Sequence, residues 1–185
     1  MNRLHTWYCQ STHWHREVRD TLLDWTLGDT DLGDGLLEIG AGPGVVTPLL
    51  AARAASVTSI DRDVSALVAL RARTAHARAI GADATRLPFG DCRFSTVAAV
   101  TKLHHVAGRT PKRRLLREAW RVLQPGGAFV GCDATDSLAL RLFHMGDTFE
   151  PVDPDQLACD LASAGFAQIW VVAAGRYVKW SASRP

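Results

Sequence analysis

Short apolar runs alternate with helical patterns along this chain. Five runs bounded by turn residues occupy 35–40, 56–61, 77–83, 95–102 and 127–133. The segments 45–53 and 65–76, between the first three runs, carry apolar residues at helical spacing. Runs of this length that alternate with helices are typical of a parallel sheet covered on both faces. The pattern therefore predicts an α/β fold.

The clearest helical pattern begins at Thr110, which we expect to be the N-cap, with Pro111 at the first helical position. The segment 124–127, rich in glycine and proline, ends this helix. Its apolar residues share one face, as in an amphipathic helix that packs on a sheet. They are Leu115, Leu116, Ala119, Trp120 and Leu123.

The last third of the chain contains one helix and a hairpin. The segment 134–153 is irregular, and a helical pattern then runs through Leu157, Leu161 and Ala164 to Gly165. Two final apolar runs, 167–173 and 176–181, lie on either side of a short turn. This arrangement predicts a hairpin at the edge of the sheet.

Length and composition indicate one globular domain, 1–185, that buries roughly 70% of its unfolded surface. We expect 1–34 to form a helical N-terminal arm and 134–153 a lid segment. The start of the chain lacks the basic and apolar regions of a signal peptide, and no window reaches the roughly 18 apolar residues that span a bilayer. These features predict a cytoplasmic protein without a membrane span, and the rich use of arginine and alanine suggests a bacterial source.

Cysteine and charge patterns exclude several classes of protein. The four cysteines are scattered and form no Cys-x-x-Cys pair, which argues against a zinc knuckle or a disulfide framework. The net charge is only +2, and basic side chains gather in the helix at 109–121. We interpret them as its solvated face and do not expect a nucleic-acid partner, because aromatic residues for base stacking are not interleaved with them and the total charge is nearly balanced.

The first apolar run ends in a glycine-rich turn, Glu38-Ile39-Gly40-Ala41-Gly42-Pro43-Gly44. Open α/β sheets bind ligands beyond the carboxyl ends of their strands, where glycine lets a ligand approach the backbone. In a dinucleotide fingerprint the third glycine would stand at Val45. Because valine stands where the fingerprint has glycine, the turn favours a nucleoside ligand without a pyrophosphate over NAD.

Two acidic residues end the second and third runs. Asp61 is placed to accept hydrogen bonds from ribose hydroxyls, and Asp83 to accept one from an adenine amino group. Each acid taken singly could instead cap a helix, but three polar sites at successive strand ends favour a ligand site.

Four segments, 36–44, 59–61, 81–89 and 121–127, resemble the class I S-adenosylmethionine-dependent methyltransferases. The resemblance covers about 35–133 and implies a Rossmann-like, doubly wound, seven-stranded and mostly parallel sheet with an antiparallel last strand. It also implies S-adenosylmethionine as the cofactor and S-adenosylhomocysteine as the product. Ser95 departs from the aspartate of many relatives, which concerns strand packing more than the cofactor.

The resemblance assigns the parts of the cofactor to this chain. Glu38 and the glycines are expected near the methionine part, Asp61 near the ribose and Asp83 near the adenine. The complete set expected to bind the cofactor is Glu38, Gly40, Ala41, Gly42, Gly44, Asp61, Arg62, Asp83, Ala84 and Thr101.

Methyl transfer requires alignment of donor and acceptor and, for a hydroxyl acceptor, removal of a proton. The segment 101–105 ends the fourth run, and its His104 and His105 are the candidate general bases. Either histidine could instead pack against the loop or orient it. We expect no metal site, because adjacent side chains should point apart and no carboxylate lies nearby at ligand spacing.

The acceptor is expected to be a small or lipid-like molecule that is methylated at a hydroxyl oxygen, with carbon as the alternative. The chain lacks the Asn-Pro-Pro-Tyr type of motif that marks methylation of amino groups on bases. Tyr8, Trp14 and His144 are candidate acceptor or lid residues, although an aromatic arm could equally serve to dock a terminal helix. A homodimer could complete the pocket. The remaining alternatives are a noncatalytic cofactor-binding partner and an RNA methyltransferase.

Overall fold

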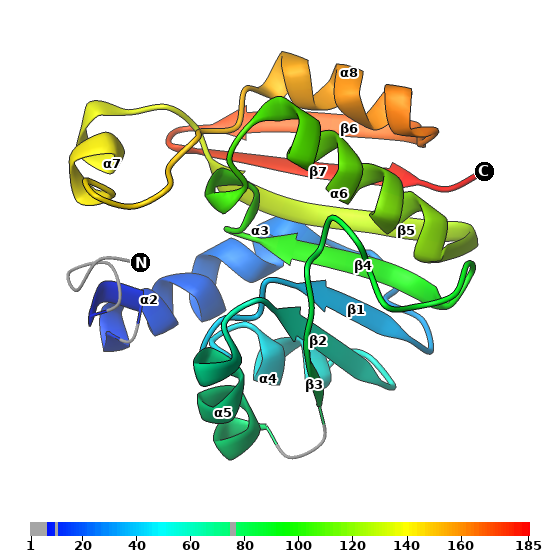
Figure 1. Cartoon of the computed structure of the whole chain (residues 1–185), viewed down its shortest axis with the longest axis horizontal. Coiled ribbons are helices and arrows are strands. Elements are labelled where there is room, and N and C mark those ends of the chain that lie inside the picture. The colour runs from blue at the N-terminus through cyan, green and yellow to red at the C-terminus, as the bar shows by residue number, and fades with distance from the viewer. Residues whose placement is uncertain (1–6, 10, 75–76) are drawn as a thin grey trace.

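The computed structural model describes residues 7–9, 11–74 and 77–185, which form one seven-stranded sheet with helices on both faces (Figure 1). The strand order is β3-β2-β1-β4-β5-β7-β6. Strands β1 to β5 pair in parallel, and β7 pairs antiparallel with both β5 and β6. This confirms the expected doubly wound sheet with an antiparallel last strand. The strands are β1 Leu36–Ile39, β2 Val57–Asp61, β3 Arg78–Gly81, β4 Phe94–Val100, β5 Leu123–Ala134, β6 Ala167–Ala174 and β7 Tyr177–Ser183.

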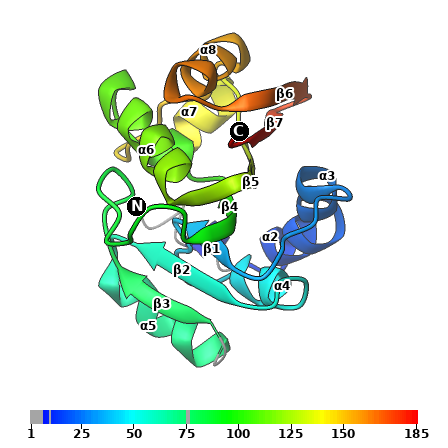
Figure 2. The same ribbon diagram turned by 90° about the vertical axis from the view of Figure 1, so that its right-hand side faces the viewer.

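Helices cover the two faces of the sheet (Figure 2). One face carries α6 Arg109–Val122 and α8 Pro154–Ala164. The other carries α4 Thr47–Ala51, α5 Val64–Arg73 and an N-terminal helix made of α2 Thr12–Glu17, the π-helix η1 Val18–Leu22 and α3 Leu23–Leu27. The short helices η2 Leu103–His105 and α7 Leu138–Phe143 follow β4 and β5. Among the described residues, no helix is both long and apolar enough to cross a bilayer.

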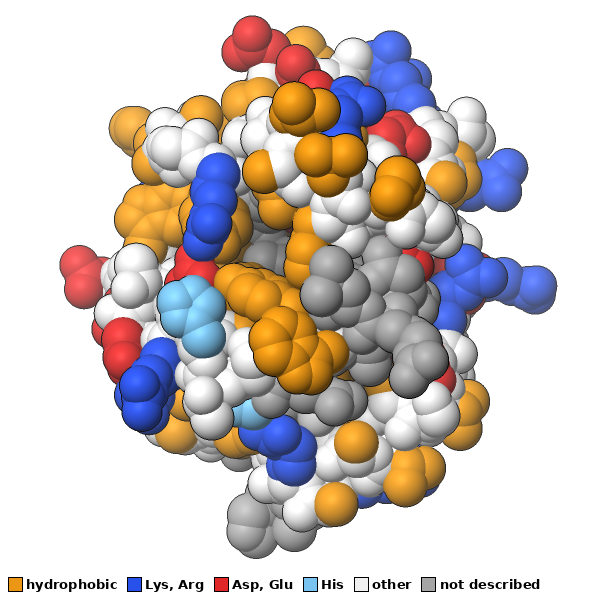
Figure 3. All heavy atoms as spheres, turned by 90° about the vertical axis from the view of Figure 1, so that its left-hand side faces the viewer, with side chains coloured by type: hydrophobic (Ala, Val, Ile, Leu, Met, Phe, Trp, Pro, Cys, Tyr) orange, Lys and Arg blue, Asp and Glu red, His pale blue; other side chains and the backbone are white. Residues whose placement is uncertain are grey.

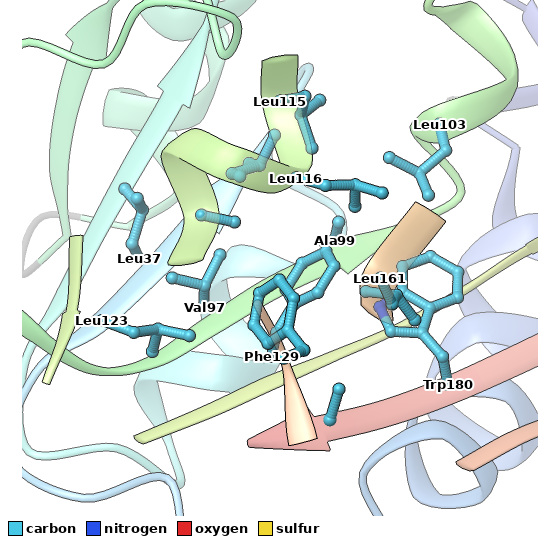
Figure 4. Close-up of a cluster of buried hydrophobic side chains, with 14 of the residues drawn as sticks. Leu37, Val97, Ala99, Leu103, Leu115, Leu116, Leu123, Phe129, Leu161 and Trp180 are labelled. Carbon is cyan, nitrogen blue, oxygen red and sulfur yellow. The ribbon is translucent and has the colours of Figure 1, made fainter. Parts of the chain in front are cut away.

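The hydrophobic core is divided by the sheet into two layers, because neighbouring side chains of a strand point to opposite faces. In β4, Val97 lies in the layer under α6 and α8, and Ala98 lies in the layer under the N-terminal helix. Figure 4 shows the first layer, where leucines of α6 and α8 pack around Phe129 and Trp180. Burial of one such large side chain stabilises the fold by roughly 1.5 to 3 kcal/mol.

The start of α6 differs from the sequence prediction. The helix begins at Arg109, and its N-cap is Gly108 with φ 84° and no capping side chain, so Thr110 as N-cap was wrong. The Gly108 N–H donates to the Glu150 carboxylate over 2.5 Å, which holds Gly108 in a conformation that suits glycine. The Lys112 N–H donates to the Gly108 carbonyl, which closes the first turn.

Candidate active site

Two cavities adjoin beyond the carboxyl ends of the parallel strands. One has a volume of about 570 Å³ and is here called the polar cavity; the other, about 340 Å³, is called the apolar cavity. Figure 3 looks onto the end of the molecule that holds α7 and α2, where hydrophobic side chains surround a hollow. The polar cavity is lined by residues that include Gly42, Asp61, Arg62, Asp83, Ala84 and Thr85. The apolar cavity is lined by residues that include Tyr8, Trp14, Val46, Val100, Leu140, Phe143 and His144. Both are lined by Gly40, Pro43, Lys102 and His105.

The glycine turn forms part of this common wall. Gly40 and Gly42 have φ values of 75° and 53°, a region that side chains rarely adopt. A Cβ on Gly40 would lie 2.6 Å from Lys102 Cγ, and one on Gly42 would lie 3.1 Å from Lys102 Nζ. The turn therefore requires glycine because the Lys102 side chain crosses directly above it.

Glu38 supports the turn from within the core. Its side chain is buried, and its Oε2 accepts hydrogen bonds from Thr47 Oγ1 over 2.6 Å and from Ser59 Oγ over 2.7 Å. Burial raises the pKa of Glu38, while these two hydroxyls oppose that shift. The carboxyl lines neither cavity. Its arrangement links β1, β2 and α4 beneath the turn.

Asp61 and Asp83 lie on one side of the polar cavity. Asp61 Oδ2 accepts the Gly42 N–H over 2.8 Å, and its Oδ1 accepts the Asp63 N–H over 2.9 Å. The pKa of Asp83 is lowered, first by the Thr85 backbone N–H and further by the Thr85 hydroxyl. Each ionised carboxylate has additional lone pairs for ligand hydroxyl or amino groups.

His104 and Asp133 form a buried pair beside the apolar cavity. Asp133 Oδ1 lies 2.5 Å from His104 Nδ1, and its Oδ2 accepts the backbone N–H of Leu103 over 2.6 Å. Burial opposes ionisation of Asp133, yet His104 and the backbone N–H groups hold its pKa below the usual value. An ionised carboxylate only accepts hydrogen bonds, so His104 Nδ1 carries a proton in this pair.

His105 and His144 lie beside His104. The ring centroids of His104 and His105 are 4.0 Å apart, and those of His104 and His144 are 5.2 Å apart. The expectation that the adjacent side chains of His104 and His105 point apart was therefore wrong. The 3₁₀ turn of η2 changes the course of the backbone directly after β4, and each of the two rings is held by a different partner.

Residues near the N-terminus meet the segment that follows β5 beside the apolar cavity. The Tyr8 ring contacts the Phe143 ring edge to face at a centroid distance of 5.3 Å, and it also lies 5.6 Å from Trp14. The Tyr8 hydroxyl donates to Glu17, which also accepts the Tyr177 hydroxyl. The three candidate acceptor residues Tyr8, Trp14 and His144 thus line one cavity.

Not all residues that were expected to bind the cofactor line the polar cavity. Thr101 and Ala41 line the apolar cavity, whereas Gly44 lines neither and packs against Leu70 of α5. Arg62 is exposed at the rim of the polar cavity, with Nε 3.9 Å from Asp83 Oδ2. Ser95 has the expected packing role, because its hydroxyl accepts the Gly35 N–H.

The sequence analysis missed two residues at this site, Lys102 and Asp133. Asp133 is the penultimate residue of β5 and Asp61 is the last of β2, and this repeated placement of an acid near a strand end was an available signal. Lys102 lies two residues after the end of β4, but only the fold brings it over the glycine turn.

The basic face of α6 is largely neutralised by acidic partners. Arg113 Nε lies 2.7 Å from Asp160, and Arg121 Nε lies 2.8 Å from Glu118. Lys112 Nζ lies 3.4 Å from Glu150. These pairs agree with a solvated helix face.

The sequence is similar to that of known methyltransferases. Residues 37–131 match a family model described as a methyltransferase domain. Demethylmenaquinone methyltransferase of Mycobacterium tuberculosis is 35% identical over 124 residues, 67% of this chain and 48% of that protein. The protein of the same name from Mycolicibacterium vanbaalenii is 34% identical over 124 residues, with 67% and 50% covered. The chain spans about half the length of the curated relatives it matches.

Solved structures share the fold over nearly the whole chain. A SAM-dependent methyltransferase from Thermotoga maritima superposes with a TM-score of 0.80 at 19% identity, covering 99% of this chain and 97% of that one. The N-methyltransferase NodS from Bradyrhizobium japonicum, solved with S-adenosyl-L-homocysteine, has a TM-score of 0.75 at 20% identity, with 97% and 91% covered.

Proposed function

Because this chain belongs to the class I S-adenosylmethionine-dependent methyltransferases, we propose that it moves a methyl group from S-adenosylmethionine to a hydroxyl oxygen of a small or lipid-like molecule. One observation carries the proposal: a polar cavity with nucleoside-binding features adjoins an apolar cavity that contains a His–Asp pair. A donor and an acceptor held in the two cavities would meet at their common wall.

The residues of the polar cavity fit the cofactor. Gly40 and Gly42 line this cavity without a side chain, and Asp61 and Asp83 offer carboxylate oxygens to hydroxyl and amino groups. Lys102 adds a cation at the glycine turn, where it would pair with the carboxylate of the methionine part. When bound, S-adenosylmethionine supplies an electrophilic methyl carbon attached to a cationic sulfur.

His104 is the group we propose for proton removal. Its Nε2 is buried at the apolar cavity, and it accepts the hydroxyl proton while the acceptor oxygen bonds to the methyl carbon. The electron pair of the broken carbon–sulfur bond stays on sulfur, which leaves S-adenosylhomocysteine. Asp133 orients the imidazole through Nδ1 and stabilises the imidazolium that forms.

The walls of the apolar cavity favour an apolar acceptor. Leu140 and Phe143 of α7 face the cavity. Leu138, Leu142 and Met145 are 74%, 60% and 73% exposed, so the same segment also presents apolar side chains to solvent. Several relatives are named for a small-molecule acceptor, demethylmenaquinone, which supports the same class.

The experiment that tests cofactor binding is calorimetric titration with S-adenosylhomocysteine and, in parallel, with NAD. We expect binding of S-adenosylhomocysteine only. Asp61→Ala should weaken it by about 1 to 3 kcal/mol through loss of charge-assisted hydrogen bonds. Asp20→Ala, which removes an exposed carboxylate on η1, is the matched control and should leave the affinity unchanged. Equal affinities of all three proteins would contradict the proposed ribose site.

Turnover is tested with labelled S-adenosylmethionine and a panel of hydroxylated apolar acceptors. His104→Asn should lower kcat by about 10²-fold or more without a matching loss of S-adenosylhomocysteine affinity. NMR of the product separates oxygen from carbon methylation. Binding of the cofactor without turnover of any acceptor would favour the noncatalytic alternative.

The remaining features of the proposal concern partners and location. We propose that the arm 1–34 and the segment 134–153 act as cap and lid on one domain, in a bacterial, cytoplasmic protein that does not bind nucleic acid. A salt-dependent affinity for RNA would contradict the last point. Sedimentation would test the expected homodimer.

A further inference from the structure

We propose that His104, His105 and His144 bind a divalent transition-metal ion such as Zn²⁺ at the wall of the apolar cavity. The inference rests on the proposed function, because it assigns the ion a role in activating the acceptor in that cavity. One ring nitrogen of each histidine lies within 4.8 Å of the others, and all three side chains line the cavity.

The orientation of the rings supports ligation. His104 Nδ1 bonds to the Asp133 carboxylate, His105 Nδ1 lies 3.2 Å from the Thr148 carbonyl, and His144 Nδ1 lies 2.8 Å from the Leu140 carbonyl. Since carboxylate and carbonyl oxygens only accept, each Nδ1 carries a proton, and in the neutral imidazole the lone pair is then on Nε2. Histidines that bind metals commonly make this second hydrogen bond, which fixes the tautomer and makes the ligand more basic.

The burial of His104 supports a bound ligand independently of the ring orientations. This residue is only 5% exposed, and its Nε2 has no hydrogen-bond partner among the described residues. A buried acceptor without a partner is costly unless a ligand completes it. The His104 ring lies against the rings of His105 and His144, so a metal ion held by the cluster would use this lone pair.

The donor set indicates the kind of ion. Three neutral imidazoles suit Zn²⁺ and related ions, and catalytic zinc sites have three protein ligands with a fourth position open. Zinc–nitrogen bonds of about 2.1 Å in a tetrahedron bring the nitrogens to about 3.4 Å, so the cluster would have to contract. His144 follows the short helix α7 directly, outside the sheet, and is the ligand best placed to shift.

The open position would face the apolar cavity. An acceptor hydroxyl that binds there loses its proton more readily, because the ion stabilises the resulting oxyanion. With the ion bound, the proton passes to solvent, because the Nε2 lone pair of His104 is then held by the metal; the role of His104 as the base applies to the metal-free protein. Formation of the carbon–oxygen bond and departure of S-adenosylhomocysteine are unchanged.

The test is calorimetric titration of chelator-treated full-length protein with ZnCl₂, together with absorption spectra after addition of Co²⁺. We expect one equivalent of Zn²⁺ to bind and a tetrahedral Co²⁺ spectrum without a sulfur charge-transfer band. His144→Phe, chosen because the ring stacks on Phe149, should weaken Zn²⁺ binding at least tenfold. His13→Ala, which removes a histidine that is 77% exposed on α2, should leave it unchanged.

A second variant guards against loss of folding. Asp133→Asn keeps the side-chain shape and should weaken Zn²⁺ binding about 10- to 100-fold by removing the partner of His104. Equal Zn²⁺ affinity in wild type, His144→Phe and Asp133→Asn would overturn the proposal. A sulfur charge-transfer band would also overturn it, since Cys9 lines the same cavity.

Binding of S-adenosylhomocysteine to the metal-free protein separates the two proposals. If it binds and Zn²⁺ does not, the metal site is wrong and the methyltransferase proposal stands. If Zn²⁺ binds and S-adenosylhomocysteine does not, the proposed function fails while the metal site stands.

Discussion

Lys102 lies between the two cavities. Its stem crosses the glycine turn and its side chain lines both cavities, so its charge lies where the cofactor and the acceptor would meet. The cation also opposes the raised pKa of the buried Glu38 beneath the turn. A cation so close to a sulfonium is unfavourable unless an anion lies between them, and the methionine carboxylate of the cofactor is the anion at hand.

Lys102→Met tests this pairing. We expect the affinity for S-adenosylhomocysteine to fall by about 1 to 2 kcal/mol, because a charge-assisted hydrogen bond is lost while the apolar stem is retained. Arg114→Met, on the exposed face of α6, removes the same charge far from the turn and should change nothing. Titration calorimetry measures both; unchanged affinity in Lys102→Met would place the carboxylate elsewhere.

At the scale of elements, the sequence predicts those helices and strands that depend on residues close together in the chain. The strands were recognisable because apolar runs and strand-end residues are adjacent in the chain, and these patterns also led to the turn and to Asp61 and Asp83. The N-cap of α6 could not be recognised from the sequence, because Gly108 is held by Glu150, which lies 42 residues away in the chain. The histidine cluster was missed because His144 is also distant from His104 in the chain. The irregular segment that carries His144 has no periodicity from which the position of this residue could be predicted.

Gly44 illustrates packing between elements. Its φ is 79°, and a Cβ there would lie 3.0 Å from Leu70 Cγ and 3.1 Å from Leu70 Cα in α5. Gly126 has a similar φ of 78° with nothing within 4 Å, so it serves as a control for backbone strain. We expect Gly126→Ala to cost about 1 to 2 kcal/mol of unfolding free energy. Gly44→Ala should cost about 1 to 3 kcal/mol more, from overpacking. Equal losses in urea denaturation would contradict the packing role.

Glu118 joins α6 to the loop after β3, and this contact predicts a pH dependence. The side chain of Arg121 and the Leu87 N–H lower the pKa of Glu118. A lowered folded-state pKa means that this stabilisation is complete above the unfolded value of about 4.3 and is lost as pH falls through the folded-state pKa.

We therefore expect Glu118→Gln to destabilise the protein at pH 7 by about 1 kcal/mol and to have a smaller effect near pH 3.5. Urea denaturation across this range measures the difference. Asp136→Asn, which breaks an exposed pair with Arg141, should show a weaker pH dependence, because solvent screens that pair. A constant difference between wild type and Glu118→Gln at all pH values would refute the linkage.

At the scale of the whole molecule, the active site joins parts that are far apart in the chain. The arm, the glycine turn, the end of β4 and the lid meet over one edge of the sheet. Arg176 and Tyr177 of the C-terminal hairpin also bind Glu17 of the arm. Among the described residues, an aromatic contact between Tyr8 and Phe143 links the proposed arm and lid.

Tyr8→Ala should loosen the lid without unfolding the sheet, since Tyr8 is outside both core layers. We expect faster hydrogen exchange of the amides in 138–145, with exchange in β4 and β5 unchanged. Trp7→Ala, which removes a neighbouring ring that is 67% exposed, is the matched control. Equal exchange in both variants would show that the lid holds its position without the arm.

The strand order has a consequence for synthesis on the ribosome. β7 lies between β5 and β6, so β5 is an open edge of the growing sheet until the residues of β7 have emerged. Until then Phe129 has no Trp180 to pack against, and the β5 backbone can pair with another nascent chain. Emergence of β7 is thus the step that ends the exposure of this edge. Ribosomes that stall in the hairpin would release a chain with most of the active-site residues but a strong tendency to aggregate.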